Sequence, residues 1–166
     1  GIFVPAEKIK PSDIYLKSLE KSISKFVNVM SDIPVGVPLY GRLTSRFGYR
    51  RDPFNGRLAF HTGIDLRATY KQPVRATANG VVVFSGWKRG YGKVVIIKHK
   101  YDFETIYAHL AWKRVGINQP VKAGDIIGYA GSTGRSTGVH LHYEIRRYGK
   151  LVNPLKLLYF NNTNTL

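Results

Sequence analysis

The chain has 166 residues, and 26 Lys and Arg against 10 Asp and Glu give it a formal charge of +16 with histidine neutral. A domain of this size buries about 70% of its unfolded surface without cross-links, and the 43% hydrophobic content argues against disorder. No apolar run approaches the ~20 residues of a membrane-spanning helix, and the absence of cysteine excludes disulfides and Cys-based zinc fingers. The charge predicts a polyanionic neighbour: nucleic acid, anionic lipid and an anionic cell wall all remain open.

Residues 11–31 carry the pattern of an amphipathic helix. Apolar side chains recur close to every 3.6 residues, and lysines occupy the opposite face. Ser12 is the candidate N-cap, and Asp13 lies in the first turn, where the helix dipole favours a negative charge. The Pro- and Gly-rich residues 34–38 end the helix, so the helix and its linker form a first predicted part, residues 1–38. The apolar positions are Ile14, Leu19, Ile23, Phe26, Val27 and Met30.

The next part, residues 39–160, alternates short β-prone runs with Gly, Pro and Asn. Two runs, 81–84 and 94–97, are apolar throughout, so we predict that they form the centre of a sheet. Residues 90–92 are typical of a hairpin turn between them. We therefore predict a compact, mainly antiparallel β-sheet or sandwich after the N-terminal α-helix, followed by a polar tail at 161–166. The predicted strands are 74–76, 80–87, 93–99, 104–110, 125–129 and 139–147.

His61 and Asp65 are the first candidate site residues. Their spacing would place them on one face of a helix, but Gly63 and the β-prone surroundings favour a loop or a strand edge. Imidazole and carboxylate groups are both good ligands for zinc. A turn carboxylate that caps a backbone amide explains Asp65 equally well, so this pair alone does not define a site.

Three more histidines lie in β-prone runs. His140 and His142 alternate, so both imidazoles point to one side of a strand, and His109 ends another run. Taken singly, each is most simply a hydrogen-bonded residue of a β domain, and His99 stays in that class. Two histidines and an aspartate, however, supply the three protein ligands of a catalytic zinc with a position open to water. Two more histidines beside the metal could move a proton and stabilise an oxyanion.

These patterns together resemble the M23 (LytM/lysostaphin-type) family of zinc metallopeptidases. The block at residues 60–66 carries the His-x-x-x-Asp motif of that family, and the last block carries its His-x-His motif. The resemblance spans roughly residues 39–158 and leaves only the N-terminal helix outside. The matching blocks are residues 43–50, 60–66, 107–110, 121–128 and 131–144.

The resemblance implies that His61, Asp65 and His142 bind one zinc ion. It implies that His109 and His140 activate the water and stabilise the transition state, in roles that the sequence does not separate. Relatives that act as activators without catalysis lack some of these positions, whereas this chain has all five. The implied activity is zinc metalloendopeptidase cleavage of peptide cross-links in peptidoglycan, with D,D cross-links between stem peptides favoured over glycine bridges.

Location and substrate contacts follow from the same resemblance. It implies a cell-envelope protein, periplasmic or extracellular, with a membrane anchor in a region absent from this chain as one option. Arg50 and Arg135 are candidates for binding a stem-peptide carboxylate, because a guanidinium can grip a carboxylate with two hydrogen bonds. Tyr49 and Tyr91 are candidates for lining a substrate groove. Solvated charge and ordinary packing remain the simpler interpretation for most arginines and tyrosines.

Two other classes of function remain as hypotheses. The first is a catalytically silent module of the same fold that binds the wall or recruits a partner. Its support is the apolar face of the N-terminal helix, which would dock on the β domain, on an upstream region or on a second subunit, giving a homo- or hetero-dimer. The other is nucleic-acid binding from charge alone. No recognition motif accompanies the basic residues, so we expect no specific nucleic-acid partner.

Overall fold

The computed structural model describes residues 10–158, and the chain divides into two units, one ending at Met30 and the next beginning at Ser31. The predicted polar tail, residues 161–166, lies outside the described residues. The elements are α1 (Lys10–Ser31), β1 (Leu43–Ser45), β2 (Gly48–Arg51), β3 (Leu58–His61), β4 (Ile64–Arg67), β5 (Pro73–Arg75), β6 (Gly80–Lys88), β7 (Gly92–His99), β8 (Phe103–Lys113), β9 (Pro120–Val121), β10 (Ile126–Ala130), β11 (His140–Arg147), β12 (Lys150–Val152) and α2 (Leu155–Leu158).

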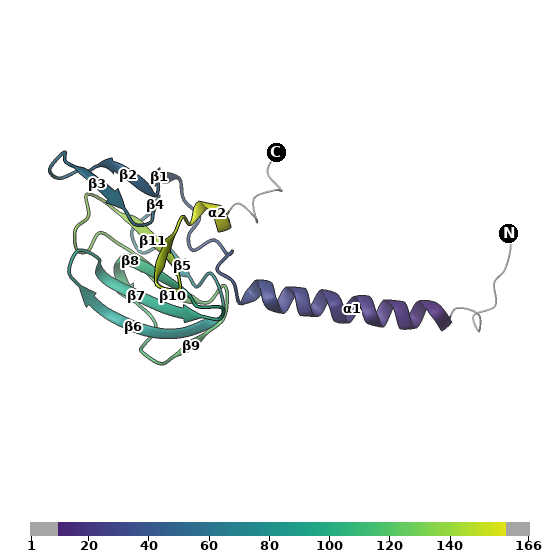
Figure 1. Cartoon of the computed structure of the whole chain (residues 1–166). Coiled ribbons are helices and arrows are strands. Elements are labelled where there is room, and N and C mark those ends of the chain that lie inside the picture. Colours follow the sequence, from purple (N-terminus) through teal and green to yellow (C-terminus); the bar gives the residue numbers. More distant parts are fainter. Residues whose placement is uncertain (1–9, 159–166) are drawn as a thin grey trace. The chain divides into compact units, whose positions relative to one another are not determined.

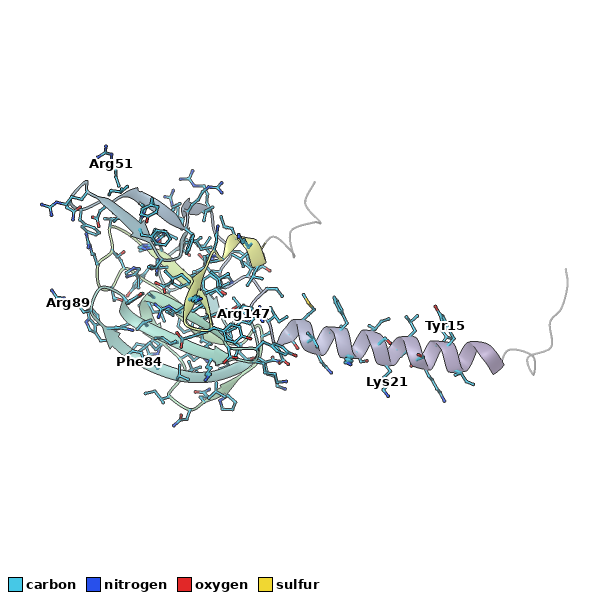
Figure 2. All side chains as sticks on the ribbon, in the orientation of Figure 1. Tyr15, Lys21, Arg51, Phe84, Arg89 and Arg147 are labelled. Carbon is cyan, nitrogen blue, oxygen red and sulfur yellow. The ribbon has the colours of Figure 1, made fainter. Side chains whose placement is uncertain are left out.

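Helix α1 confirms the predicted N-terminal helix but starts one residue earlier. Because it begins at Lys10, Ser12 lies inside the helix and is not its N-cap. The amphipathic pattern places Tyr15 and Lys21 on different sides of the helix (Figure 2). Among the described residues, no helix is both long and apolar enough to cross a membrane.

The second unit confirms the mainly antiparallel β fold. A ten-stranded sheet runs in the order β1-β4-β11-β8-β7-β6-β9, with β10 and β12 pairing beside this path and β5 pairing with β10. A separate hairpin, β2–β3, lies beside the sheet (Figure 1). All of these strand pairs are antiparallel. Strands β1 to β4, β9 and β12 were not predicted. The expected setting of His61 and Asp65 was a loop or a strand edge; His61 is the last residue of β3, whereas Asp65 lies within β4, between β1 and β11.

Only one of the two apolar runs lies at the centre of the sheet. Strand β7 lies between β6 and β8, and Val94, Val95 and Ile97 are fully buried. The prediction was wrong for β6, where Val81 and Val83 are 43% and 42% exposed. The physical reason is that Val81 and Val83 flank the fully buried Val82 and so leave the opposite face of the sheet, which is uncovered there. Strand β6 also lies next to the sheet edge, with only the two-residue strand β9 outside it.

Alternation along the central strands separates the hydrophobic core from the opposite face of the sheet. On β11, Leu141, Tyr143 and Ile145 are fully buried in the main core. Their neighbours His140 and His142 point to the other side, as the two-residue period requires. A second, smaller cluster of buried apolar side chains packs on that face of the sheet. The core residues of β11 therefore fix which side chains are presented to the second face.

The turn between β3 and β4 passes close to β11 at Gly63. A Cβ added at this position would collide with the backbone carbonyl of Tyr143. Only glycine therefore lets β4 approach β11 closely enough for Asp65 to pair in register with His142. The position of Asp65 in the candidate site therefore depends on the close packing of Gly63 against β11.

We expect Gly63→Ala to lower the free energy of unfolding by roughly 1–3 kcal/mol, as overpacking against rigid backbone does. Urea unfolding of the variant and of the parent chain measures the difference. Gly116→Ala is the matched control, because a Cβ there meets nothing within 4 Å. Equal stability of Gly63→Ala and Gly116→Ala would contradict this account of the turn.

Candidate metal centre

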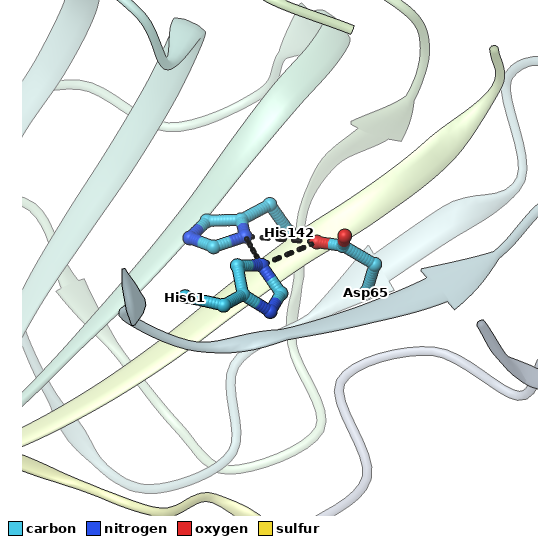
Figure 3. A group of neighbouring side chains, drawn as sticks. All are labelled: His61, Asp65 and His142. Atoms are coloured by element: carbon cyan, nitrogen blue, oxygen red, sulfur yellow. Dashed lines mark hydrogen bonds and ion pairs between the residues drawn. The ribbon is translucent and has the colours of Figure 1, made fainter. Parts of the chain in front are cut away.

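Three side chains from three strands converge on one point (Figure 3). His61 ends β3, Asp65 lies in β4 and His142 lies in β11. The Nε2 atom of His61 lies 3.1 Å from Nδ1 of His142 and 3.2 Å from Oδ1 of Asp65. The third side of the triangle, from Nδ1 of His142 to Oδ1 of Asp65, is 2.9 Å. The two histidines are buried and Asp65 is largely so.

This triangle fits zinc in both size and donor chemistry. Zinc binds imidazole nitrogen and carboxylate oxygen at about 2.0–2.2 Å in tetrahedral geometry, which places neighbouring ligand atoms about 3.3 Å apart. Two imidazole nitrogens and one carboxylate oxygen at 2.9–3.2 Å from one another match one face of such a tetrahedron. All three residues line the cleft described below. The site can therefore hold one ion with three protein ligands.

In both His61 and His142, the ring nitrogen that lies outside the triangle is hydrogen-bonded to another group. Nδ1 of His61 donates to the backbone carbonyl of Arg46 at 2.8 Å. Nε2 of His142 donates to Oε1 of Glu144 at 3.1 Å. These contacts make Nδ1 of His61 and Nε2 of His142 donors to groups outside the triangle, and they turn Nε2 of His61 and Nδ1 of His142 toward Asp65.

Glu144 is a fully buried carboxylate to which the sequence analysis gave no role. Thr62 and Tyr91 donate hydroxyl hydrogen bonds to its Oε1, and the Arg146 guanidinium donates to Oε2 at 2.9 Å. Its position two residues after His142 on one strand was the available signal, because both side chains then share a face. The carboxylate thus positions His142 and is itself fully hydrogen-bonded.

Burial and hydrogen bonding shift the pKa values of these groups in opposite directions. Burial alone would raise the pKa of Asp65, but hydrogen bonds from His142 and His61 outweigh it and hold that pKa well below its usual range. Burial alone would lower the pKa of His142, but its bonds to Asp65 and Glu144 raise it to about 8. For Glu144, burial is likewise overcome by its donors, which lower its pKa to about 2. Both carboxylates are therefore charged at neutral pH.

His109 and His140 lie beside the triangle and are held in the same way. Their rings are 4.8 Å apart, and Nε2 of His140 lies 3.8 Å from Oδ1 of Asp65. Nδ1 of His109 donates to the carbonyl of Thr133 at 2.7 Å, and Nδ1 of His140 donates to that of Gly138 at 2.8 Å. With Nδ1 committed as a donor, Nε2 is the nitrogen of each ring that is available to exchange a proton. Burial also lowers the pKa of His109 to about 4, so it is neutral at neutral pH.

A backbone irregularity turns His109 toward the site. Strand alternation would place His109 on the core side, since Tyr107 belongs to the main core and Ala108 to the second face. His109 instead adopts a φ of +60°, and the strand returns to the core side at Leu110. Such a left-handed residue within a strand is an irregularity that redirects a side chain. Sequence periodicity could not reveal it.

The five residues share a cleft of about 740 Å³. Three of the predicted substrate residues, Arg50, Tyr91 and Arg135, line it. The hydroxyl of Tyr91 is bonded to Glu144, and Nη2 of Arg135 lies 2.7 and 2.8 Å from the two carboxylate oxygens of Asp52, another lining residue. Tyr49 is not among the lining residues. It is 78% exposed and packs edge-on against Phe60 with ring centroids 5.0 Å apart.

The comparisons with known proteins place this domain in a family. The model of peptidase family M23 matches residues 59–154, which include the three converging residues and both neighbouring histidines. The chain therefore belongs to the M23 peptidase family, and its fold is the LytM/lysostaphin-type domain. This confirms the resemblance described from the sequence.

Two curated relatives differ in what their names state. The chain is 50% identical over 120 residues to the DD-carboxypeptidase/endopeptidase Mpg of Neisseria meningitidis, covering 72% of this chain and 27% of the relative. It is 48% identical over 97 residues to the murein hydrolase activator NlpD of Escherichia coli, covering 58% of this chain and 25% of the relative. The chain thus spans about a quarter of the length of these relatives. The first name is that of a peptidase, and the second is that of an activator of murein hydrolases.

A solved structure agrees with the family assignment. A zinc-containing peptidase from Vibrio cholerae superposes with a TM-score of 0.67 at 34% identity, over 71% of this chain and 38% of that chain. Its name associates the fold with zinc, and the triangle of His61, Asp65 and His142 is the group in this chain whose donors suit that ion.

The raised pKa of His142 predicts a pH-dependent stability of the metal-free chain. A histidine whose pKa rises from about 6.5 in the unfolded chain to about 8 in the folded one contributes stability that is lost as pH rises through 8. We expect the chelator-treated chain to lose about 1 kcal/mol of unfolding free energy between pH 7 and pH 9. The pKa values of His99 and His109 are lowered, so these two residues change the unfolding free energy only at pH values below that interval.

Urea unfolding at the two pH values measures this loss. His142→Gln is the control, because it lacks the titrating ring and should show a flat profile over the same interval. Stability that rises between pH 7 and pH 9 in the parent chain would contradict the hydrogen-bonding scheme around His142.

Proposed function

We propose that this domain is a zinc-dependent peptidoglycan endopeptidase that cleaves peptide cross-links, with D,D cross-links favoured over glycine bridges. The observation that carries the proposal is the triangle of ligand atoms with two correctly oriented histidines beside it in one cleft. His61, Asp65 and His142 would hold the ion, and His109 and His140 would handle protons. The family assignment and the cell-wall names of the relatives support the same conclusion.

The chemistry follows from the positions of the side chains. A zinc ion held at the triangle would lower the pKa of a bound water and polarise the scissile carbonyl. His109 and His140 can each accept a proton at Nε2, because their Nδ1 protons are committed to backbone carbonyls. Once protonated, the same Nε2 atoms can donate to a developing oxyanion or to the leaving amine. Either histidine can fill either role, so His109 or His140 could accept the proton while the other stabilises the oxyanion.

The charge of the chain suits this substrate. Arg50, Tyr91 and Arg135 line the cleft and are the proposed contacts for stem peptides. Peptidoglycan and its attached polymers are anionic, so a +16 protein is attracted to them over the Debye length. We therefore propose that the domain works in the cell envelope, periplasmic or extracellular.

A catalytically silent module is the second candidate, and one observation favours it. A relative 48% identical over 97 residues is named an activator of murein hydrolases. In this case the cleft would bind wall or a partner without cleaving, and α1 would supply the predicted dimer contact. Zinc binding alone does not separate the two candidates, whereas cleavage does.

We expect His61→Ala and Asp65→Ala to lose the metal, because each removes one of three protein ligands. His140→Ala should retain zinc but lose on the order of 10²-fold or more in turnover, as removal of a general base or an oxyanion donor does. Zinc per chain after dialysis and digestion of cross-linked muropeptides, followed by chromatography, measure the two quantities. Asp102→Asn removes an exposed carboxylate outside the cleft lining and should change neither.

A parent chain that holds zinc yet leaves both D,D-linked and glycine-bridged muropeptides intact would establish the silent module instead. A parent chain that retains no zinc would overturn the metal site itself.

A further inference from the structure

Arg67 lies one step along the sheet from the metal centre. It follows Asp65 by two residues on β4, so both side chains leave the same face of the strand. In the antiparallel register of β4 with β11, Asp65 is opposite His142 and Arg67 is opposite His140. Directly opposed residues have Cβ atoms about 4.5–5.5 Å apart. Arg67 therefore borders the candidate catalytic histidine, and it lines the same cleft.

Arg67 is also the one cleft arginine whose charge is not neutralised within the described part of the chain. Arg135 is tied to Asp52 by two bonds, and Arg50 lies 3.6 Å from Oδ2 of Asp65. The Arg67 guanidinium is exposed and has no hydrogen-bond or ion-pair partner among the described side chains. The two carboxylates that line the cleft, Asp52 and Asp65, are already engaged. An anionic group entering this end of the cleft would meet a free guanidinium.

We infer that Arg67 binds the free α-carboxylate of the residue that follows the scissile bond. The inference rests on the proposed peptidase function and names the class of substrate for that site. Two residues along a strand span about 6.6 Å, and one residue of an extended substrate spans at most about 3.8 Å. A carboxylate one residue beyond a carbonyl at the triangle thus falls within reach of the Arg67 side chain. A guanidinium can hold it with two parallel hydrogen bonds.

This contact would select among peptide cross-links by charge. A D,D cross-link in which the amine comes from a centre with its own α-carboxylate presents a negative charge next to the cleaved bond. A peptide cut before its C-terminal residue presents the same group. In a glycine bridge the corresponding position is an uncharged amide. Arg67 therefore favours substrates of the first two kinds and gives the preference for D,D cross-links a physical basis.

The test uses two synthetic cross-linked dimers that differ only in the α-carboxylate of the amine-side centre, which is free in one and a carboxamide in the other. We expect the zinc-loaded parent chain to cleave the free-acid dimer with a kcat/KM about 10- to 100-fold higher, mainly through KM. Arg67→Gln should lower kcat/KM for the free acid to the carboxamide value and leave cleavage of the carboxamide unchanged. Arg67→Lys should recover only part of the preference, since it keeps the charge but not the planar fork.

Arg42→Gln is the matched control. It removes an exposed arginine whose backbone carbonyl accepts a hydrogen bond from the Arg67 amide, yet its side chain does not line the cleft. It should preserve the full preference. Equal cleavage of both dimers by the parent chain, or an equal loss on both in Arg67→Gln, would overturn the inference while the peptidase function stands. Failure of the parent chain to cleave either dimer would instead overturn the D,D preference in the proposed function, and the inference with it.

Discussion

The antiparallel pairing of β4 with β11 is the constraint on which the site depends. It places Asp65 opposite His142, although the two residues are 77 positions apart in the chain. A slip of one residue would turn the side chains of β11 to the other face and remove the metal centre. The fully buried Leu141, Tyr143 and Ile145 prevent that slip, because it would expose all three. Hydrophobic burial on one face of β11 thus fixes the chemistry on the other.

Buried negative charge organises the site within a strongly basic protein. Asp65 and Glu144 lie on either side of His142 and hold its two ring nitrogens in defined directions. Such carboxylates remain charged in the interior only because each accepts several hydrogen bonds. Beyond them the cleft is lined by arginines, of which Arg135 is neutralised by Asp52. The net charge of +16 therefore describes the surroundings of the site, and a few buried carboxylates define its chemistry.

Much of this arrangement was accessible from the sequence because it follows local periodicity. The two-residue period placed His140 and His142 on one face of a strand, and both line the cleft. The family resemblance supplied the grouping of residues from three strands, which no local pattern contains.

The remainder depends on contacts between distant segments. The orientation of His109 follows from a positive φ that only the packed sheet imposes. The exposure of Val81 and Val83 follows from their place on an uncovered face of β6, next to the edge of the sheet. Glu144 and Arg67 had a usable local signal, since each stands two residues after a ligand on its strand. The roles of both residues become clear only in the folded structure, from the hydrogen bonds that Glu144 accepts and from the absence of a partner for Arg67 among the described side chains.

The most direct test of the central claim is the histidine tautomer pattern of the zinc-loaded chain, measured by long-range ¹H–¹⁵N NMR of ¹⁵N-labelled histidine. The β4–β11 pairing and the outer hydrogen bonds predict that the ion binds Nε2 of His61 and Nδ1 of His142, with Nε2–H of His142 donated to Glu144. Binding of zinc through Nε2 of His142, or no change in either ring on addition of zinc, would contradict it.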